Sequence, residues 1–99
     1  MSDSLKFDDG KIRMDLVPAE ALEEIGKILT YGIKNGYSED SWRKVDSKRY
    51  DAALMRHYVS WKKGEKFDEE SKLRTLSHVL CNVVFLLVNE IEKDSKLDK

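Results

Sequence analysis

The chain has 99 residues, which fits one domain over residues 1–99 and leaves no room for a second hydrophobic core of useful size. Its 37% charged and 40% hydrophobic residues, with a mean hydropathy of -0.59, are typical of a folded, well-solvated domain and argue against a disordered or membrane chain. A formal net charge of -1 argues against a nucleic acid polymer as partner, so any phosphate binding must come from local clusters.

The cellular location is expected to be the cytoplasm. The charged start, MSDSLKFDDGK, lacks the apolar core of a signal peptide, and no segment is expected to approach a membrane span. The single cysteine, Cys81, lies in an apolar run and cannot form an internal disulfide, so we expect it to be buried and reduced.

The first expected elements are an irregular arm and a helix. Residues 1–17 mix charges with Gly10 and have no helical period. Pro18 suits the first turn of a helix, and Asn35-Gly36 is a strong stop signal, so a helix is predicted from about Pro18 to Gly36. Its predicted core stripe consists of Leu22, Ile25, Leu29 and Ile33, with Ile28 alongside.

A loop and two further helices should follow. Residues 37–48 lack a sustained period, whereas apolar and aromatic residues from Tyr50 to Trp61 recur at helical spacing and predict a helix from about Lys48 to before Gly64. A turn over 64–68 and a third helix over 69–93 come next. Residues 94–99 are expected to be a frayed, solvated tail.

The third predicted helix is apolar nearly all round. Between Leu76 and Val88 the polar residues are Ser77, His78 and Asn82, and Asn82 suits an interhelical hydrogen bond. Two partner helices cannot cover such a helix completely. The sequence therefore predicts an all-α, three-helix protomer with an irregular N-terminal arm, assembled as a helix-bundle homodimer or homotetramer.

Two groups of carboxylates are candidates for a metal site. Glu20, Glu23 and Glu24 share one face of the first helix, although acidic residues in a first turn also simply favour the helix dipole. Glu65 and Asp68 precede the third helix, where Asp68 has the alternative role of N-cap. If the two patterns meet across a bundle, they supply the all-oxygen shell that Mg²⁺ requires.

Basic and aromatic residues offer partners for phosphates and a base. Arginine suits bidentate phosphate contacts and loop aromatics stack on bases. For each of these roles there is an alternative: a solvated surface for Lys34, a buried ion pair for Arg56 and a loop anchor for Trp42. The candidates are Lys11, Arg13, Lys34, Trp42, Arg43, Arg56, His57 and His78.

Other chemistries lack a motif. The sequence has no nucleophile-and-base set, no Walker-type phosphate loop and no zinc pattern. Metal-assisted hydrolysis and plain ligand binding are the chemistries that remain.

Several motifs occur in a familiar order over Lys6 to Glu90. They are K-x-D-x-G-K-x-R-x-D-L-x-P from Lys6 to Pro18, ALEEIGKILTYGIK, a Trp-Arg loop, AALMRHYVSW, GEKFDEES and LSHVLCNVVFLL. This set resembles the phage-type dATP/dGTP diphosphohydrolase N-terminal domain family, related to the MazG-like all-α nucleotide pyrophosphohydrolases.

The resemblance implies a Mg²⁺-dependent pyrophosphohydrolase, with Mn²⁺ as an alternative metal, that cuts purine (d)NTPs to the monophosphate and pyrophosphate. It implies a metal site made by Glu65 and Asp68 with a pair from Glu20, Glu23 and Glu24, and the sequence leaves open which pair coordinates. Glu24, Glu65 and Asp68 are the implied catalytic residues. If the gene is phage-borne, the expected location is the cytoplasm of the infected host. A catalytically weak nucleotide-binding or nucleotide-sequestering protein is the alternative, and a helical interaction module is a third.

The chain also departs from the pattern expected for that family. Where the pattern reads E-S-G-x-x-H-L-x-H, Lys72 replaces the Gly and Thr75 replaces the first His, and Ser41 stands where Asn is usual. These positions bear on substrate choice and on activity.

Overall fold

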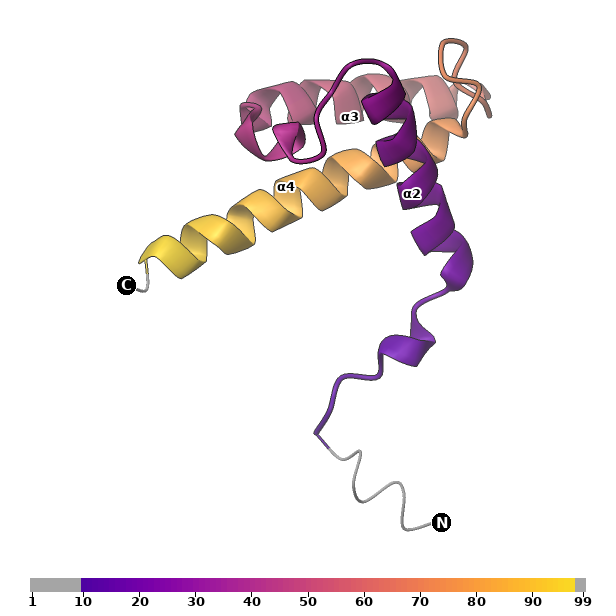
Figure 1. Ribbon diagram of the computed structural model, residues 1–99. Coiled ribbons are helices and arrows are strands. Elements are labelled where there is room, and N and C mark those ends of the chain that lie inside the picture. The colour runs from indigo at the N-terminus through magenta and orange to yellow at the C-terminus, as the bar shows by residue number, and fades with distance from the viewer. Residues whose placement is uncertain (1–9, 98–99) are drawn as a thin grey trace, which may run out of the picture.

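The structure, a computed structural model, describes residues 10–97 and is built from three α-helices (Figure 1). These are α2 (Ala19–Lys34), α3 (Ser47–Lys62) and α4 (Thr75–Leu97), with short 3-10 turns η1 (Met14–Leu16) and η2 (Ser41–Lys44). Over residues 10–97 the only β-type pairing is an isolated bridge between Phe67 and Arg74. The predicted all-α class is therefore confirmed, and residues 1–9 of the predicted arm lie outside the described range.

Helices α3 and α4 form an antiparallel hairpin, and α2 crosses the amino-terminal half of α4 (Figure 1). The hairpin register is set by contacts that run in opposite directions along the two helices. The Asn89 amide lies 3.5 Å from Ser47 Oγ, Tyr50 packs on Phe85 at 4.8 Å, and the His57 and His78 rings stack at 4.6 Å.

Helix α2 has the predicted bounds but not the predicted core face. Pro18 precedes its first turn, and Gly36 at φ 97° ends it in a left-handed conformation that favours glycine. Ile28 is the buried residue, whereas Leu22 and Ile33 are 59% and 49% exposed. The expected stripe is therefore wrong at Leu22 and Ile33, whereas its central members Ile25 and Leu29 are half-buried beside Ile28.

Helix α3 confirms its prediction within a residue or two. The Asp46 carboxylate accepts a hydrogen bond of 3.0 Å from the Lys48 amide and caps the helix, and Gly64 at φ 95° ends it.

The start of α4 differs from the prediction of a helix over 69–93. The Asp68 carboxylate accepts the Ser71 amide at 2.9 Å and its carbonyl accepts the Lys72 amide at 2.8 Å. These bonds make a turn in which Lys72 adopts φ 65°, so no helix continues through it. Asp68 therefore organises the loop before α4, and the helix begins six residues later than predicted, at Thr75.

The carboxyl end of α4 also extends beyond the prediction. The helix continues to Leu97, so the expectation of a frayed tail is wrong for residues 94–97, and residues 98–99 lie outside the described range. Lys96 lies in the last turn, where a positive charge favours the helix dipole.

The interior of the described chain is very small. Ile28 and Cys81 are its buried hydrophobic residues, and Thr75, Ser77 and Asn82 are buried polar ones. Cys81 is buried as predicted, and this burial raises the pKa of its thiol to about 12. The Asn82 amide donates to the His78 carbonyl at 2.8 Å inside α4, and an interhelical bond from Asn82, in the core or at a subunit interface, stays a prediction.

The apolar composition of α4 also bears on whether this helix could cross a membrane. By length and composition alone, Thr75–Lys96 is able to cross a membrane, contrary to the expectation that no segment approaches a span. Core helices of soluble proteins meet the same criterion, so this finding is weak evidence for a membrane.

The left-handed Lys72 gives a test of the loop. An L-residue in this region costs about 1–2 kcal/mol, which outweighs the roughly 0.5–1 kcal/mol of flexibility that glycine adds. Lys72→Gly should therefore raise the free energy of unfolding by about 0.5–1 kcal/mol, measured by denaturant unfolding.

Lys63 is the matched control, because it is also an exposed lysine but has φ -79°. Lys63→Gly should lower the free energy of unfolding. Equal losses in both variants would contradict the strained turn.

Candidate functional site

A cluster of polar side chains lies where the loop 65–74 meets α3 and α4. Asp68 Oδ2 is 3.7 Å from His78 Nε2, and the same nitrogen is 2.7 Å from Ser71 Oγ. Ser71 Oγ also accepts the Leu73 amide at 3.2 Å, and the rings of His57 and His78 stack with an interplanar angle of 15°. We call Asp68, Ser71, His78 and His57 the Asp68 cluster.

Both histidines of the cluster favour the neutral form. Burial lowers the pKa of His78, and the neighbouring His57 lowers it further, although Asp68 and Glu70 oppose the shift. Burial also lowers the pKa of His57, against an opposing effect of Asp68. Ser71 Oγ and His78 Nε2 share a hydrogen bond of 2.7 Å, and the Ser71 oxygen also accepts the Leu73 amide.

Asp68 is held as a carboxylate. Burial alone would raise its pKa, but hydrogen bonds from the Ser71 backbone and side chain, together with His78 and His57, lower it overall. Across residues 10–97, the hydrogen bond and the His78 contact of this carboxylate both involve Oδ2.

Glu24 reaches the same turn of α4 from helix α2. The Ser77 hydroxyl donates to Glu24 Oε1 at 2.6 Å, and Lys27 Nζ lies 2.8 Å from Oε2. The Lys27 and Ser77 hydrogen bonds hold the pKa of Glu24 below its ordinary value. Ser77 and His78 are consecutive in α4, so Glu24 and Asp68 contact adjacent residues, whose side chains point about 100° apart around the helix.

The other predicted metal ligands are not gathered with these two. Glu20 and Glu23 are exposed on α2, and Glu65 is exposed in the turn after α3. Among residues 10–97 no group of three or more His, Cys, Asp or Glu side chains is arranged to hold a metal ion. One chain therefore brings Glu24 and Asp68 to one turn of α4 without completing a ligand set.

A cavity of about 520 Å³ lies between α2 and the loop that carries the Asp68 cluster. Lys27, Tyr31 and Lys34 line it from α2, and Ser71 lines it from the loop. Burial and the charges of Glu70 and Asp68 raise the pKa of Tyr31. The volume lies within the range of small-molecule sites, and two lysines beside it suit an anion.

The predicted Trp-Arg loop lies farther along α4, beside Phe85 and Glu92. Trp42 stacks on Phe85 at 4.9 Å, and its carbonyl accepts the Tyr50 hydroxyl, so this tryptophan anchors the loop. The Arg43 guanidinium lies 4.5 Å from the Trp42 ring centre and forms an ion pair with Glu92.

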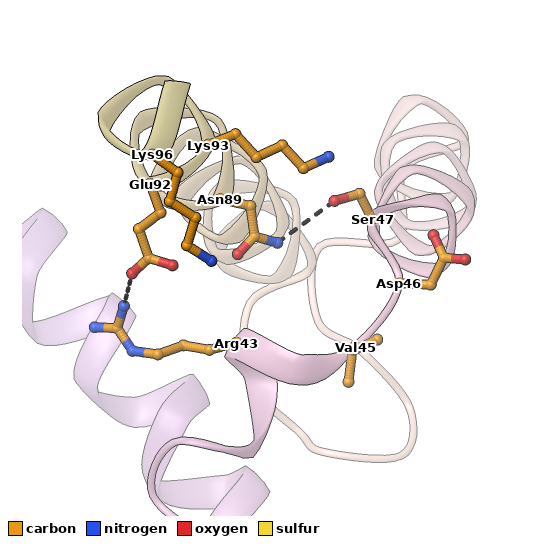
Figure 2. Close-up of a pocket in the computed structure, with 8 residues that line it drawn as sticks. All are labelled: Arg43, Val45, Asp46, Ser47, Asn89, Glu92, Lys93 and Lys96. Atoms are coloured by element: carbon orange, nitrogen blue, oxygen red, sulfur yellow. Dashed lines mark hydrogen bonds and ion pairs between the residues drawn. The ribbon is translucent and has the colours of Figure 1, made fainter. Parts of the chain in front are cut away.

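Figure 2 shows a second cavity, of about 270 Å³, beside this arginine. It is lined by Arg43, Val45, Asp46, Ser47, Asn89, Glu92, Lys93 and Lys96. Glu92 lies fourteen positions after His78, which corresponds to about 21 Å along a helix. Arg43 and the Asp68 cluster therefore do not share one site within a single chain.

The remaining predicted nucleotide-binding residues are exposed. Lys11 and Arg13 lie in the arm, where the Arg13 guanidinium binds both carboxylate oxygens of Asp15 at 2.8 Å. Arg56 is exposed on α3, so the alternative of a buried ion pair is wrong for it.

Two serines of the site were missed by the motif analysis. Ser71 appeared only as part of a motif string, and Ser77 only as a polar interruption of an apolar helix. The position of Ser71 three residues after Asp68 could have indicated that the two residues interact. Aspartate carboxylates often accept hydrogen bonds from backbone amides of following residues in turns, as Asp68 does from Ser71.

Thr75 is unusual because its hydroxyl is buried without a partner. The residue is 1% exposed, and within the described part of the chain its Oγ1 has no hydrogen-bond partner. An unsatisfied buried hydroxyl costs free energy, so this position at the start of α4 is not optimised for stability in the isolated chain.

The family comparison covers the whole chain. The family described as "dATP/dGTP diphosphohydrolase, N-terminal" matches residues 1–99. The chain belongs to this family. A curated relative from Salmonella phage PMBT28, named "dATP/dGTP diphosphohydrolase", is 27% identical over 82 residues, which are 83% of this chain but 28% of the relative. The chain therefore matches less than a third of that protein's length, and no solved structure matches it.

The backbone geometry at position 72 bears on one departure from the pattern expected for the dATP/dGTP diphosphohydrolase N-terminal family. The pattern expected for this family has Gly at position 72, and the backbone there has the positive φ that glycine adopts without strain. Lys72 therefore keeps the geometry of the turn at an energetic cost.

The histidine pair predicts a pH dependence of stability. Both folded-state pKa values lie below the ordinary value, so the unfolded state binds more protons as the pH falls through about 6.5, and the free energy of unfolding decreases. His57→Phe keeps an aromatic ring on His78 and removes one titrating group. It should reduce the slope of unfolding free energy between about pH 7.5 and 5.5 by about half, because the chain has two histidines. An unchanged slope would contradict the assignment.

Proposed function

We propose that the protein acts as a Mg²⁺-dependent pyrophosphohydrolase of purine (deoxy)nucleoside triphosphates, yielding the monophosphate and pyrophosphate. The observation that supports this most directly is the approach of Glu24 and Asp68 to adjacent residues of α4, beside a cavity bordered by Lys27 and Lys34. The family description and the relative's name support the purine triphosphate as substrate.

The carboxylates fit the proposed metal in chemistry. Mg²⁺ takes oxygen ligands, and Glu24 and Asp68 are both held in the ionised form by their neighbours. Glu20, Glu23 and Glu65 are the further ligands that the proposal assigns, and Mn²⁺ is the alternative ion. The bound metal would lower the pKa of a water and neutralise charge on the triphosphate.

The residues assigned to the site have separate roles in this proposal. Lys34 and Lys27 bind phosphate oxygens, although Lys27 must then leave or share its ion pair with Glu24. Ser71 and His78 fix the orientation of the Asp68 carboxylate, and Glu24 or Glu65 accepts the proton of the attacking water. Tyr31 provides an aromatic group beside the base.

A nucleotide-binding protein with weak catalysis is the second candidate. It is favoured by the incomplete ligand set among residues 10–97 and by Thr75 at the position expected to hold a histidine. Such a protein would bind the triphosphate through the same lysines without turnover.

The assay that tests the proposal incubates the protein with each purine and pyrimidine (d)NTP and Mg²⁺ and measures monophosphate and pyrophosphate. We expect purine triphosphates to be hydrolysed, with activity lost in EDTA and restored by Mg²⁺. Asp68→Asn should lower kcat by about 100-fold or more, because it removes a metal-binding charge without changing size.

Glu69→Gln is the matched control, since Glu69 is the exposed acid next to Asp68 and should retain full kcat. Thermal stabilisation by nucleotide without any pyrophosphate would select the second candidate. Equal activity in Asp68→Asn and Glu69→Gln would reject the metal-site assignment.

A further inference from the structure

The cavity beside the Trp-Arg loop is separate from the Asp68 cluster and has no role in the proposed hydrolysis. It has a volume of about 270 Å³ and is bordered by residues 43–46, the first turn of α3 and the carboxyl-terminal half of α4 (Figure 2). Among the described residues, Val45 is the one apolar side chain that lines it, and every other lining residue is polar or charged. Such a cavity suits a small hydrophilic ligand, and it offers no aromatic ring on which a base could stack.

Positive charge predominates around this cavity. Arg43, Lys93 and Lys96 line it, together with the two carboxylates of Glu92 and Asp46. Both carboxylates already have partners, because Glu92 pairs with Arg43 and Asp46 caps α3. Within the described part of the chain, neither Lys93 nor Lys96 forms an ion pair. The two ammonium groups therefore attract an anion whose charge the cavity does not itself supply.

The arginine of the cavity is held by three contacts. Its guanidinium carbon lies 4.5 Å from the centre of the Trp42 ring, and the group forms the ion pair with Glu92. Its Nε atom also lies 3.5 Å from Asp40 Oδ1. Because these contacts fix the planar group before a ligand arrives, little entropy is lost when a further N–H of Arg43 binds an oxyanion.

The two lysines approach the cavity in different directions. Figure 2 shows Lys96 directed toward the Arg43–Glu92 pair and Lys93 directed toward Ser47. The Asn89 amide lies 3.5 Å from Ser47 Oγ, which is long for a hydrogen bond, so both polar groups can turn to a stronger partner. Charged and neutral donors thus line the cavity from α3, α4 and the loop before α3.

We infer that this cavity binds a compact phosphoryl anion, with inorganic pyrophosphate as the ligand that fits it best. Lys93 and Lys96 bind phosphoryl oxygens as point charges, and Arg43 donates N–H groups to a further oxygen. The volume of about 270 Å³ lies below the range of sites for drug-sized ligands, which favours an inorganic anion over a whole nucleotide. Two linked phosphoryl groups carry more charge than one, so they make better use of three cationic side chains.

The test is a titration of the ¹⁵N-labelled full chain with inorganic pyrophosphate in EDTA, followed by NMR chemical shifts. EDTA removes divalent cations, so binding through a metal does not contribute. We expect saturable shifts in residues 43–47 and 89–96, with a dissociation constant of about 1 mM or tighter at low ionic strength that weakens as salt is added. Shifts confined to the surroundings of Lys27 and Ser71, or no saturable shift at about 10 mM pyrophosphate, would overturn the inference.

Charge-removing variants test which side chains bind the anion. Lys93→Gln and Lys96→Gln should each raise the dissociation constant by about threefold, and the double variant by about tenfold. Both lysines are exposed, so the variants should fold normally. Lys63→Gln is the matched control, because it removes the same charge from an exposed lysine at the other end of α3 and should bind as the wild type does. Equal weakening in all the single variants indicates a general attraction of anions and overturns the site.

Two further ligands separate an inorganic anion from a nucleotide. Inorganic phosphate should bind more weakly than pyrophosphate, and deoxyguanosine monophosphate should bind no more tightly than phosphate, since no aromatic ring lines the described cavity. Tighter binding of the nucleotide than of pyrophosphate would overturn the assignment of an inorganic ligand. None of these measurements uses catalytic turnover, so their outcome is independent of whether the protein hydrolyses triphosphates.

Discussion

The arrangement of the site depends on the turn that Asp68 organises. Its carboxylate and carbonyl accept the Ser71 and Lys72 amides, which ends any helical path and delays the start of α4 until Thr75. That starting point fixes the rotation of α4, so that Ser77 faces Glu24 on α2 while His78 faces His57 on α3. A helix that began at Glu69 would give no fixed loop to hold Asp68 against His78.

The parts of the fold that were predictable from the sequence are those governed by local signals. The bounds of α2 and α3 followed from Pro18, the glycines at positions 36 and 64, and helical spacing, and the structure agrees with them to within a residue or two. The start of α4 was not predictable in this way, because the acidic run Asp68 to Glu70 suits a helix amino terminus as well as it suits a turn. The choice between them is made by Ser71 and His78, seven residues apart.

Tertiary geometry explains what the site analysis got right and what it missed. The two acidic motifs predicted that carboxylates of the first helix and of the loop meet at a metal, and this stays a prediction. That Glu24, among three glutamates, is the one that reaches Ser77 follows from how α2 crosses α4. Trp42 and Arg43 were grouped with the nucleotide site by residue type. Because α3 and α4 are antiparallel, the structure instead puts them at the far end of the hairpin. Residue type thus identified candidates, while helix crossing decided which of them meet.

The small interior and the incomplete ligand set both reflect how α2 meets α4. Ile28 is the buried residue of α2, whereas Leu22, Glu20 and Glu23 on the same helix are exposed. Helix α2 therefore brings one of its three glutamates, Glu24, into contact with α4, through the Ser77 hydroxyl. Because a helix turns by about 100° per residue, neighbouring glutamates of α2 cannot all face the same side of α4.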